Sequence, residues 1–129
     1  MKIQEINMQE LSIIFDMSEA RKEGLIFSNT TKLFLCTIKN EKIGFFGIIW
    51  HKKKATIKNI YIAHEYRKKG HFKSMFLWFD SLCYGFDIEA TCTSMSINGF
   101  LKNGFQVVQV YRNGCKKVRR EDIPGKRRF

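Results

Sequence analysis

The stretch EYRKKGHFKSMFLWF, residues 65–79, constrains this chain more than any other part of its sequence. A basic run with one glycine, Gly70, leads directly into apolar residues at three- and four-residue steps, which predicts a helix with one wide apolar stripe. The free N–H groups and positive dipole end of a helix start, with lysines nearby, can bind phosphate. A solvated turn before a core helix would have the same local sequence, so the rest of the chain has to distinguish the two.

The composition is that of a globular protein. Of its 129 residues, 44% are hydrophobic and 14% are aromatic, so the chain can bury a core and global disorder is not expected. The N-terminus lacks the apolar segment of a signal peptide, and no apolar run approaches the roughly 20 residues that cross a bilayer. We therefore expect a soluble, cytoplasmic monomer or homodimer with no membrane segment. A single domain is predicted at residues 1–120, followed by a basic tail at residues 121–129.

The cysteines predict no metal centre. None of Cys36, Cys83, Cys92 and Cys115 forms a CxxC pair or shares a metal-ligand spacing with the three histidines. Reduced and mostly buried thiols are favoured over disulfides or a metal site.

The net charge of +11 is placed unevenly along the chain. Residues 1–50 contain six basic and six acidic residues, so the remaining 23 − 6 = 17 basic and 12 − 6 = 6 acidic residues carry all of it. Such a field attracts anions, which include nucleotide cofactors, nucleic acid and acidic surfaces. It also keeps a small protein soluble, so it does not identify a partner.

The predicted elements follow the order β-α-β-β-β-α-β-α-β-β. Strands before and after the central helix form a right-handed crossover and are therefore expected to be parallel, with a ligand site at their carboxyl ends, where that helix begins. Asn113-Gly114 predicts a hairpin turn. We expect strands at residues 2–6, 33–38, 43–51, 55–62, 86–92, 105–111 and 115–119, and helices at residues 8–22, 71–84 and 94–102.

Two motifs resemble those of the GNAT acyltransferase superfamily. IYIAHEYRKKGHFKSMF is similar to its acyl-CoA-binding motif, R/Q-x-x-G-x-G/A, with Arg67, Gly70 and Phe72 at the three defined places. Downstream, NGFLKNGF resembles the family's short helix that ends in a Gly-Phe pair. The resemblance covers about residues 2–119. It implies an α/β (α+β) fold with a mixed, mostly antiparallel central sheet, one parallel splayed strand pair and helices on both faces.

The resemblance implies acetyl-CoA as the cofactor. Backbone amides around Gly70 would converge on the pyrophosphate, lysines would add charge, and the preceding strand would hold the pantetheine arm through its backbone. Asn59, beside the expected slot, is a candidate substrate-binding residue, although strand packing explains it as well. The predicted cofactor-binding residues are Ile60, Tyr61, Ile62, Arg67, Lys68, Lys69, Gly70, His71, Phe72 and Lys73.

Several positions depart from the family pattern. Phe72 stands where Gly or Ala is usual, and His64 replaces a common proline. The tyrosine that often protonates the departing thiolate maps to Phe100, which has no proton to give. The glutamate often found on the preceding strand maps to about Thr56.

Two residues remain as candidate catalytic groups. Glu89, on the strand at residues 86–92, is the best remaining carboxylate for a general base, and a solvent-facing strand residue is the alternative interpretation. Ser96 lies one helical turn before Phe100 and could point to the same place, although a residue of the helix surface would have the same position.

The C-terminal basic cluster allows two interpretations. A solvated edge hairpin carries charge that prevents strand pairing, whereas a nucleic-acid footprint would bind phosphates without reading sequence. The cluster contains Arg112, Lys116, Lys117, Arg119 and Arg120, with residues 126–128 of the tail.

The first functional hypothesis is an acyl-CoA-dependent N-acyltransferase that moves an acetyl group to an amine by direct transfer. Its acceptor is unknown and could be linked to nucleic acid, and its small size and basicity are similar to those of acyltransferases carried by bacteriophages. The alternatives are a GNAT-like enzyme that modifies DNA or RNA bases, and a non-catalytic module that binds coenzyme A or nucleic acid and has lost the usual acid.

Overall fold

The computed structural model describes residues 1–122, so most of the predicted basic tail falls outside the described residues. Seven strands form one mixed sheet with the order β1-β2-β3-β4-β5-β7-β6. The described residues divide into two compact units, residues 1–49 with 58–71 and residues 50–57 with the part of the chain from residue 72 onward. Among the described residues, no helix has the length and apolar character needed to span a membrane. A single domain at residues 1–120 stays a prediction.

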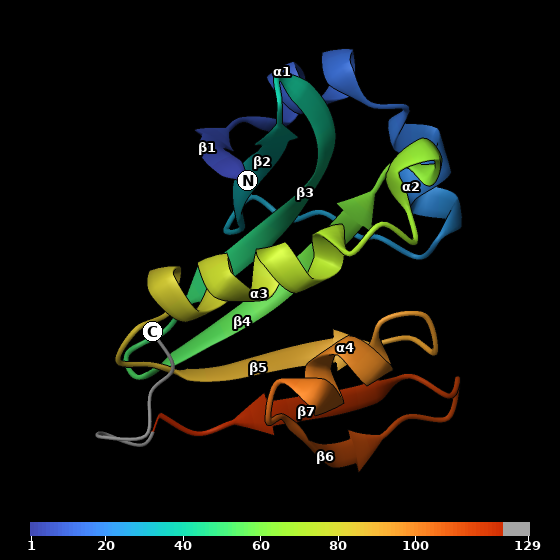
Figure 1. The fold of residues 1–129 in the computed structure, drawn as a ribbon. Helices are drawn as coiled ribbons and strands as arrows, with labels where there is room; N and C mark the ends of the chain where they lie inside the picture. The colour runs from blue at the N-terminus through green and yellow to red at the C-terminus, as the bar shows by residue number, and fades with distance from the viewer. Residues whose placement is uncertain (123–129) are drawn as a thin grey trace. The chain divides into compact units, whose positions relative to one another are not determined.

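The first unit combines antiparallel strands with two short helices (Figure 1). β1 pairs antiparallel with β2, and β2 pairs antiparallel with β3. The register of β2 with β3 shifts between Cys36, which lies opposite Gly44, and Thr37, which lies opposite Lys42. The elements that contribute to this unit are β1 (Lys2–Ile6), α1 (Met8–Ile14), α2 (Met17–Lys22), β2 (Lys32–Ile38), β3 (Glu41–Trp50), the second half of β4 (Lys54–Ile62) and the 3-10 helix η1 (His64–Tyr66).

The prediction of a single helix at residues 8–22 is wrong, because the structure has two helices there, α1 and α2. Asn7 caps α1 by accepting a hydrogen bond from the backbone N–H of Glu10 at 2.8 Å. Asp16 caps α2 in the same way, from the N–H of Ser18 at 3.0 Å. Phe15 between them has an extended backbone. The capping strength of an aspartate side chain therefore outweighs the continuous helical spacing of the apolar residues.

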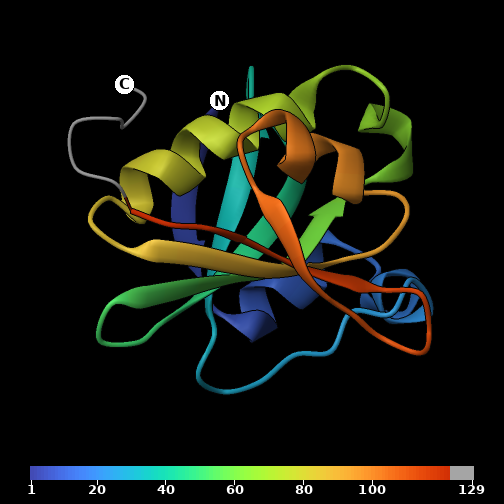
Figure 2. The ribbon, with the colours of Figure 1, turned by 90° about the horizontal axis from the view of Figure 1, so that it is seen from below.

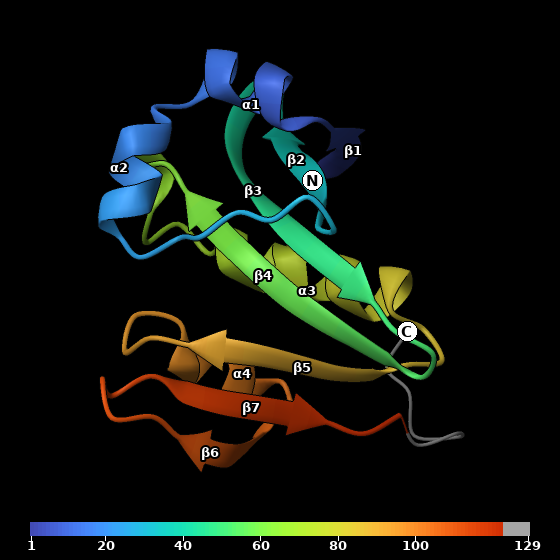
Figure 3. The same ribbon diagram turned by 180° about the vertical axis from the view of Figure 1, so that it is seen from behind.

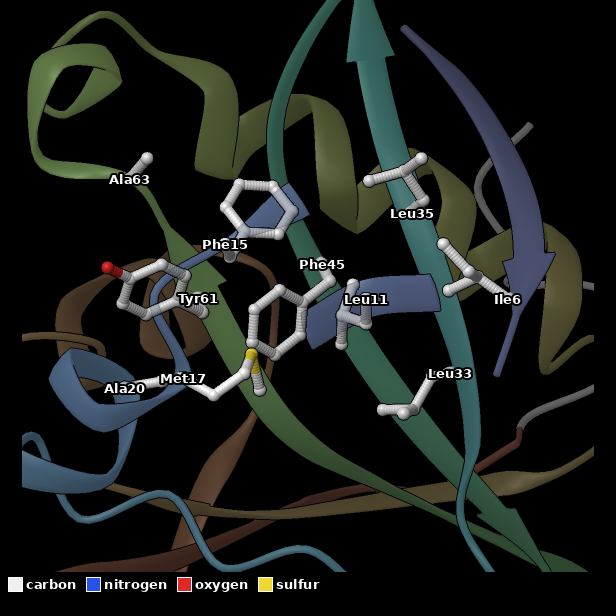
Figure 4. Close-up of a cluster of buried hydrophobic side chains, with 10 residues drawn as sticks. All are labelled: Ile6, Leu11, Phe15, Met17, Ala20, Leu33, Leu35, Phe45, Tyr61 and Ala63. Carbon is white, nitrogen blue, oxygen red and sulfur yellow. The ribbon is translucent and has the colours of Figure 1, made fainter. Parts of the chain in front are cut away.

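The core of the first unit forms where α1 and α2 pack against its strands (Figure 4). The Phe45 ring lies 5.2 Å from the Tyr61 ring and 5.5 Å from the Phe15 ring, measured between centroids. Leu11 of α1 is fully buried beside them. The strands therefore present a continuous apolar surface on this side, and Tyr61 anchors the end of β4 in it.

The second unit places its helices on one side of its strands (Figure 2). β5 pairs parallel with β4 over four residue pairs, from Lys54 opposite Asp87 to Ile57 opposite Ala90, which confirms the predicted crossover. β7 pairs antiparallel with both β5 and β6. The elements are the start of β4, α3 (His71–Leu82), β5 (Asp87–Cys92), α4 (Ile97–Lys102), β6 (Gln106–Val110) and β7 (Lys116–Arg120).

Phenylalanine rings join α3 to α4 in the second unit. The ring of Phe72 lies 4.9 Å from that of Phe76 and 5.9 Å from that of Phe100, which is 1% exposed. Gly99 provides the space, because a Cβ there would lie 2.7 Å from Cε2 and 3.0 Å from Cδ2 of Phe72. A bulky residue at position 72 is therefore matched by a glycine on α4.

We expect Gly99→Ala to lower the free energy of unfolding by about 1–2 kcal/mol, because overpacking outweighs the gain in helix propensity. Urea denaturation measures the change. Phe72→Leu in the same background removes the ring that the new methyl group meets. The effects of the two substitutions on the free energy of unfolding should therefore be non-additive. Strict additivity would show that Gly99 does not provide the space for the Phe72 ring.

Candidate functional site

The loop that precedes α3 has an unusual backbone. Lys68 and Gly70 both have positive φ, 62° and 79°, whereas Lys69 between them does not. Such alternation can direct successive N–H groups toward one side of a loop, which is the geometry of anion-binding concavities. Positive φ is uncommon for lysine, and backbone strain of this kind concentrates at functional sites. A Cβ on Gly70 would meet no atom within 4 Å, so this side of the loop is open.

The side chain of Arg67 connects this loop to the rest of the first unit through hydrogen bonds. Its Nη2 donates to both carboxylate oxygens of Glu23, at 2.7 and 2.8 Å, and its Nε donates to the carbonyl of Ile62 at 2.6 Å. The guanidinium also lies over the ring of Tyr61, 5.4 Å from its centroid. Since these contacts occupy the Arg67 side chain, the charge available to a phosphate comes from the exposed Lys68 and Lys69.

Asn59 interrupts the strand geometry of β4. Its φ is 57°, a left-handed conformation that asparagine tolerates better than most residues. Its Nδ2 donates to the carbonyl of Ile26 at 2.8 Å, and its buried Oδ1 has no hydrogen-bond partner within residues 1–122. The predicted substrate-binding residue therefore holds the segment after α2. The predicted pantetheine-binding residues, 60–62, directly follow this irregularity.

Ser96 lies in the second unit at the start of α4. It is the N-cap residue, but its hydroxyl makes no capping hydrogen bond. Burial raises the pKa of the Cys92 thiol to about 11, against a smaller opposing effect of the hydrogen bond from Ser96. The predicted catalytic hydroxyl is therefore beside a protonated, buried thiol at neutral pH. All four cysteines are free.

Glu89 is the buried charged residue of the second unit, at 6% exposure. The ammonium groups of Lys54 and Lys117 lie 3.2 and 3.4 Å from its Oε2, and Nη1 of Arg119 lies 3.5 Å from its Oε1. Burial alone would raise the pKa of Glu89. The hydrogen bond from Lys54 and the charges of Lys117 and Lys54 outweigh it, so the pKa lies below its usual value. Glu89 is therefore ionised at neutral pH and is a weak proton acceptor.

Asp87 extends this charged group along β5. Its Oδ2 accepts a hydrogen bond from Nη2 of Arg119 at 2.6 Å, and its Oδ1 accepts one from the N–H of Asp122 at 2.8 Å. These two hydrogen bonds, that from Asp122 first, hold the pKa of Asp87 below its usual value.

Sequence reasoning found some of these residues and missed others. It identified Gly70 and Glu89, but it did not connect Arg67 with Glu23 or Glu89 with three cations. The sequence contained one signal for the charged group, the alternation of charged residues along two predicted strands. Asp87 and Glu89 are two residues apart on the first strand, and Lys117 and Arg119 are two residues apart on the second, so each pair shares one face.

Structural comparison identifies the fold, although no protein-family model and no curated protein matches the sequence. An aminoglycoside 6′-N-acetyltransferase complexed with coenzyme A is 13% identical, with a TM-score of 0.72 over 96% of this chain and 98% of that chain. A GNAT family acetyltransferase from Elizabethkingia anophelis with acetyl-CoA bound is 14% identical, with a TM-score of 0.64 over 93% and 97%. A proposed acyl-CoA N-acyltransferase of Klebsiella pneumoniae is 13% identical, with a TM-score of 0.75 over 95% and 97%.

The chain thus has the GNAT fold, which confirms the predicted mixed, mostly antiparallel sheet with one parallel strand pair.

Acid should destabilise the second unit through Glu89. A carboxyl group whose pKa is lowered by folding stabilises the protein above its usual pKa, here 4.5, and this contribution is lost as the pH falls through the folded-state value. Glu89→Gln should therefore lower the free energy of unfolding at pH about 7 and reduce its further loss between pH about 5 and about 3. Urea denaturation across this range measures both effects. Glu5→Gln, in an exposed ion pair with Lys32, is the control, and an equal acid dependence in both variants would contradict the assignment.

Proposed function

We propose that this chain, which has the GNAT fold, is an N-acyltransferase that moves an acetyl group from acetyl-CoA to an amine. The observation that carries the proposal is the loop with alternating positive φ at Lys68 and Gly70, placed between the end of β4 and the start of α3. A phosphate-bearing ligand suits this loop because its backbone N–H groups supply fixed donors and its exposed lysines supply charge.

Coenzyme A would bind through the predicted residues in two groups. Residues 67–73 would hold the pyrophosphate, mainly through backbone amides, with Lys68, Lys69 and Lys73 as exposed cations. Residues 60–62 would hold the pantetheine arm through backbone hydrogen bonds. Arg67 would act indirectly, since its own side chain supports the loop from Glu23. Phe72 would not enter the phosphate site, because its ring belongs to the apolar cluster with Phe76 and Phe100.

The reaction would be a direct transfer. The neutral amine would attack the thioester carbonyl, so that a C–N bond forms and the C–S bond breaks. The nitrogen would lose one proton, and the departing thiolate would take one up. Phe100 supplies no proton, so Ser96 or water would serve as the donor. Glu89 would be the candidate base for a proton of the substrate amine, although its three cationic partners and its lowered pKa limit this role.

Two alternatives follow from specific observations. Buried Phe100 in place of a phenol favours a module that binds coenzyme A without turnover. The basic C-terminal half favours a nucleic-acid-linked acceptor, which includes a base-modifying activity. Thiol release from acetyl-CoA with candidate amines separates the first alternative from an enzyme, because a non-catalytic module would bind and release none.

Gly70→Val should abolish the rise in melting temperature that coenzyme A or acetyl-CoA produces. A β-branched residue disfavours positive φ, so the loop would lose the conformation that gathers its N–H groups. In the wild-type chain the rise should grow with ligand concentration by mass action.

Gly85→Val is the matched control. Gly85 also has positive φ, and a Cβ there would meet no atom within 4 Å, but it lies after α3. Both variants should lose a comparable stability of about 1–2 kcal/mol, and only Gly70→Val should lose the ligand response. An unchanged response in Gly70→Val, or no response in the wild-type chain, would contradict the proposal.

A further inference from the structure

We propose that Lys54 and Lys117, held in place by Glu89, form a binding subsite for an anionic group, a carboxylate or phosphate, on a small amine acceptor. The inference rests on the proposed function only where it identifies the ligand as the amine acceptor. The subsite itself consists of residues of the second unit alone. The expected substrates are therefore amines that also carry a negatively charged group.

The register of the strands brings the charged side chains together. Glu89 of β5 lies opposite Thr56 of β4 and Arg119 of β7, and Thr91 lies opposite Lys117. Because side chains alternate along a strand, these residues share one face of the sheet. Ala55, Ile57, Ile88, Ala90 and Val118, which alternate with them, are buried on the other face.

Figure 3 views β5 and β7 from the side opposite α3 and α4. Neither helix of the second unit covers this face of the two strands. The side chains of Lys54 and Lys117 remain 39% and 32% exposed, although both contact a nearly buried carboxylate. A ligand in solution can therefore reach the two ammonium groups.

The group has more positive charge than its own carboxylates neutralise. Three cations, Lys54, Lys117 and Arg119, form ion pairs with two carboxylates, Asp87 and Glu89. Two further charges of opposite sign act on the group and offset each other, Glu121 on Arg119 and Lys53 on Asp87. Both ammonium groups share one oxygen, Oε2 of Glu89, and an ammonium has three N–H donors. Donors and positive charge thus remain for an additional anion.

Glu89 has the role of a positioning residue. A buried carboxylate needs partners, and here it fixes two flexible lysines at one point instead of leaving them spread in solvent. A lysine side chain loses rotamer entropy when it is ordered, so lysines already held by Glu89 bind an anion at a lower entropic cost. The subsite lies along the parallel pairs of β4 with β5 that contain its residues, Lys54 opposite Asp87 and Thr56 opposite Glu89.

The test measures binding to the full chain with excess coenzyme A, so that phosphate probes are excluded from the Gly70 loop. Two matched pairs of probes are titrated at constant ionic strength: O-phosphoethanolamine against ethanolamine, and glycine against methylamine. Melting temperature reports binding without requiring turnover. The charged member of at least one pair should bind more tightly, and the two pairs distinguish phosphate from carboxylate.

The variants compare Lys117 with its neighbour. Lys117→Gln should weaken binding of the preferred anionic probe about threefold to tenfold, in the range between an exposed ion pair and a charge-assisted hydrogen bond. Lys54→Gln should have the same effect, because its ammonium lies on the same oxygen. Lys116→Gln is the control, since Lys116 is exposed and makes no ion pair with any residue from 1 to 122. It should bind the probe as the wild-type chain does.

The other outcomes overturn the proposal. Equal weakening by Lys116→Gln and Lys117→Gln would indicate a diffuse field, and no preference for charged probes would show that the subsite does not exist. Salt-sensitive binding of a short single-stranded oligonucleotide, weakened equally by both variants while small anions do not bind, would assign the face to nucleic acid. If the anionic probe binds through Lys117 but coenzyme A does not bind at all, the acyltransferase proposal fails and the subsite stands.

Discussion

The contacts of Arg67 determine where the loop before α3, residues 67–70, begins. Its guanidinium joins Glu23 at the end of α2, the Ile62 carbonyl at the end of β4 and the ring of Tyr61. A planar group with several fixed donors can hold these three segments at once, which the single ammonium of a lysine could not. The left-handed residues Lys68 and Gly70 directly follow this anchored point.

The second unit depends on a different constraint, the packing of aromatic rings. Phe72, Phe76 and Phe100 form a connected group of rings, and Gly99 leaves room for the first of them. The two departures from the family motif, at positions 72 and 100, are therefore linked by direct contact at 5.9 Å between ring centroids. The rings at positions 72 and 100 therefore belong to one packing arrangement, and neither carries a hydroxyl group.

Local sequence predicted most of the fold because most elements have strong and consistent signals. The wide apolar stripe after Gly70 and the Asn113-Gly114 turn gave α3 and the β6–β7 hairpin with small errors at their ends. The helix at residues 8–22 failed because periodicity ignored the capping ability of Asp16. No sequence pattern predicted the 3-10 helix η1, which lies a few residues before Gly70.

The candidate site was less predictable, because its chemistry depends on partners that are distant in the sequence. Gly70 could be identified from its neighbours, but the use of the Arg67 charge depends on Glu23, 44 residues away. The three cationic partners of Glu89 come from β4 and β7, and only the strand register reveals them.

The two cationic regions use positive charge in physically different ways. In the Gly70 loop, the backbone supplies the directed donors, and exposed lysines add charge with little fixed geometry. On the face of β5 and β7, side chains supply the donors, and a buried carboxylate gives them their geometry. The first arrangement suits a diphosphate that accepts many hydrogen bonds at once. The second suits a single small anion, because its donors converge on one point, and this difference favours a small charged acceptor over a polyanion that spans the whole basic half.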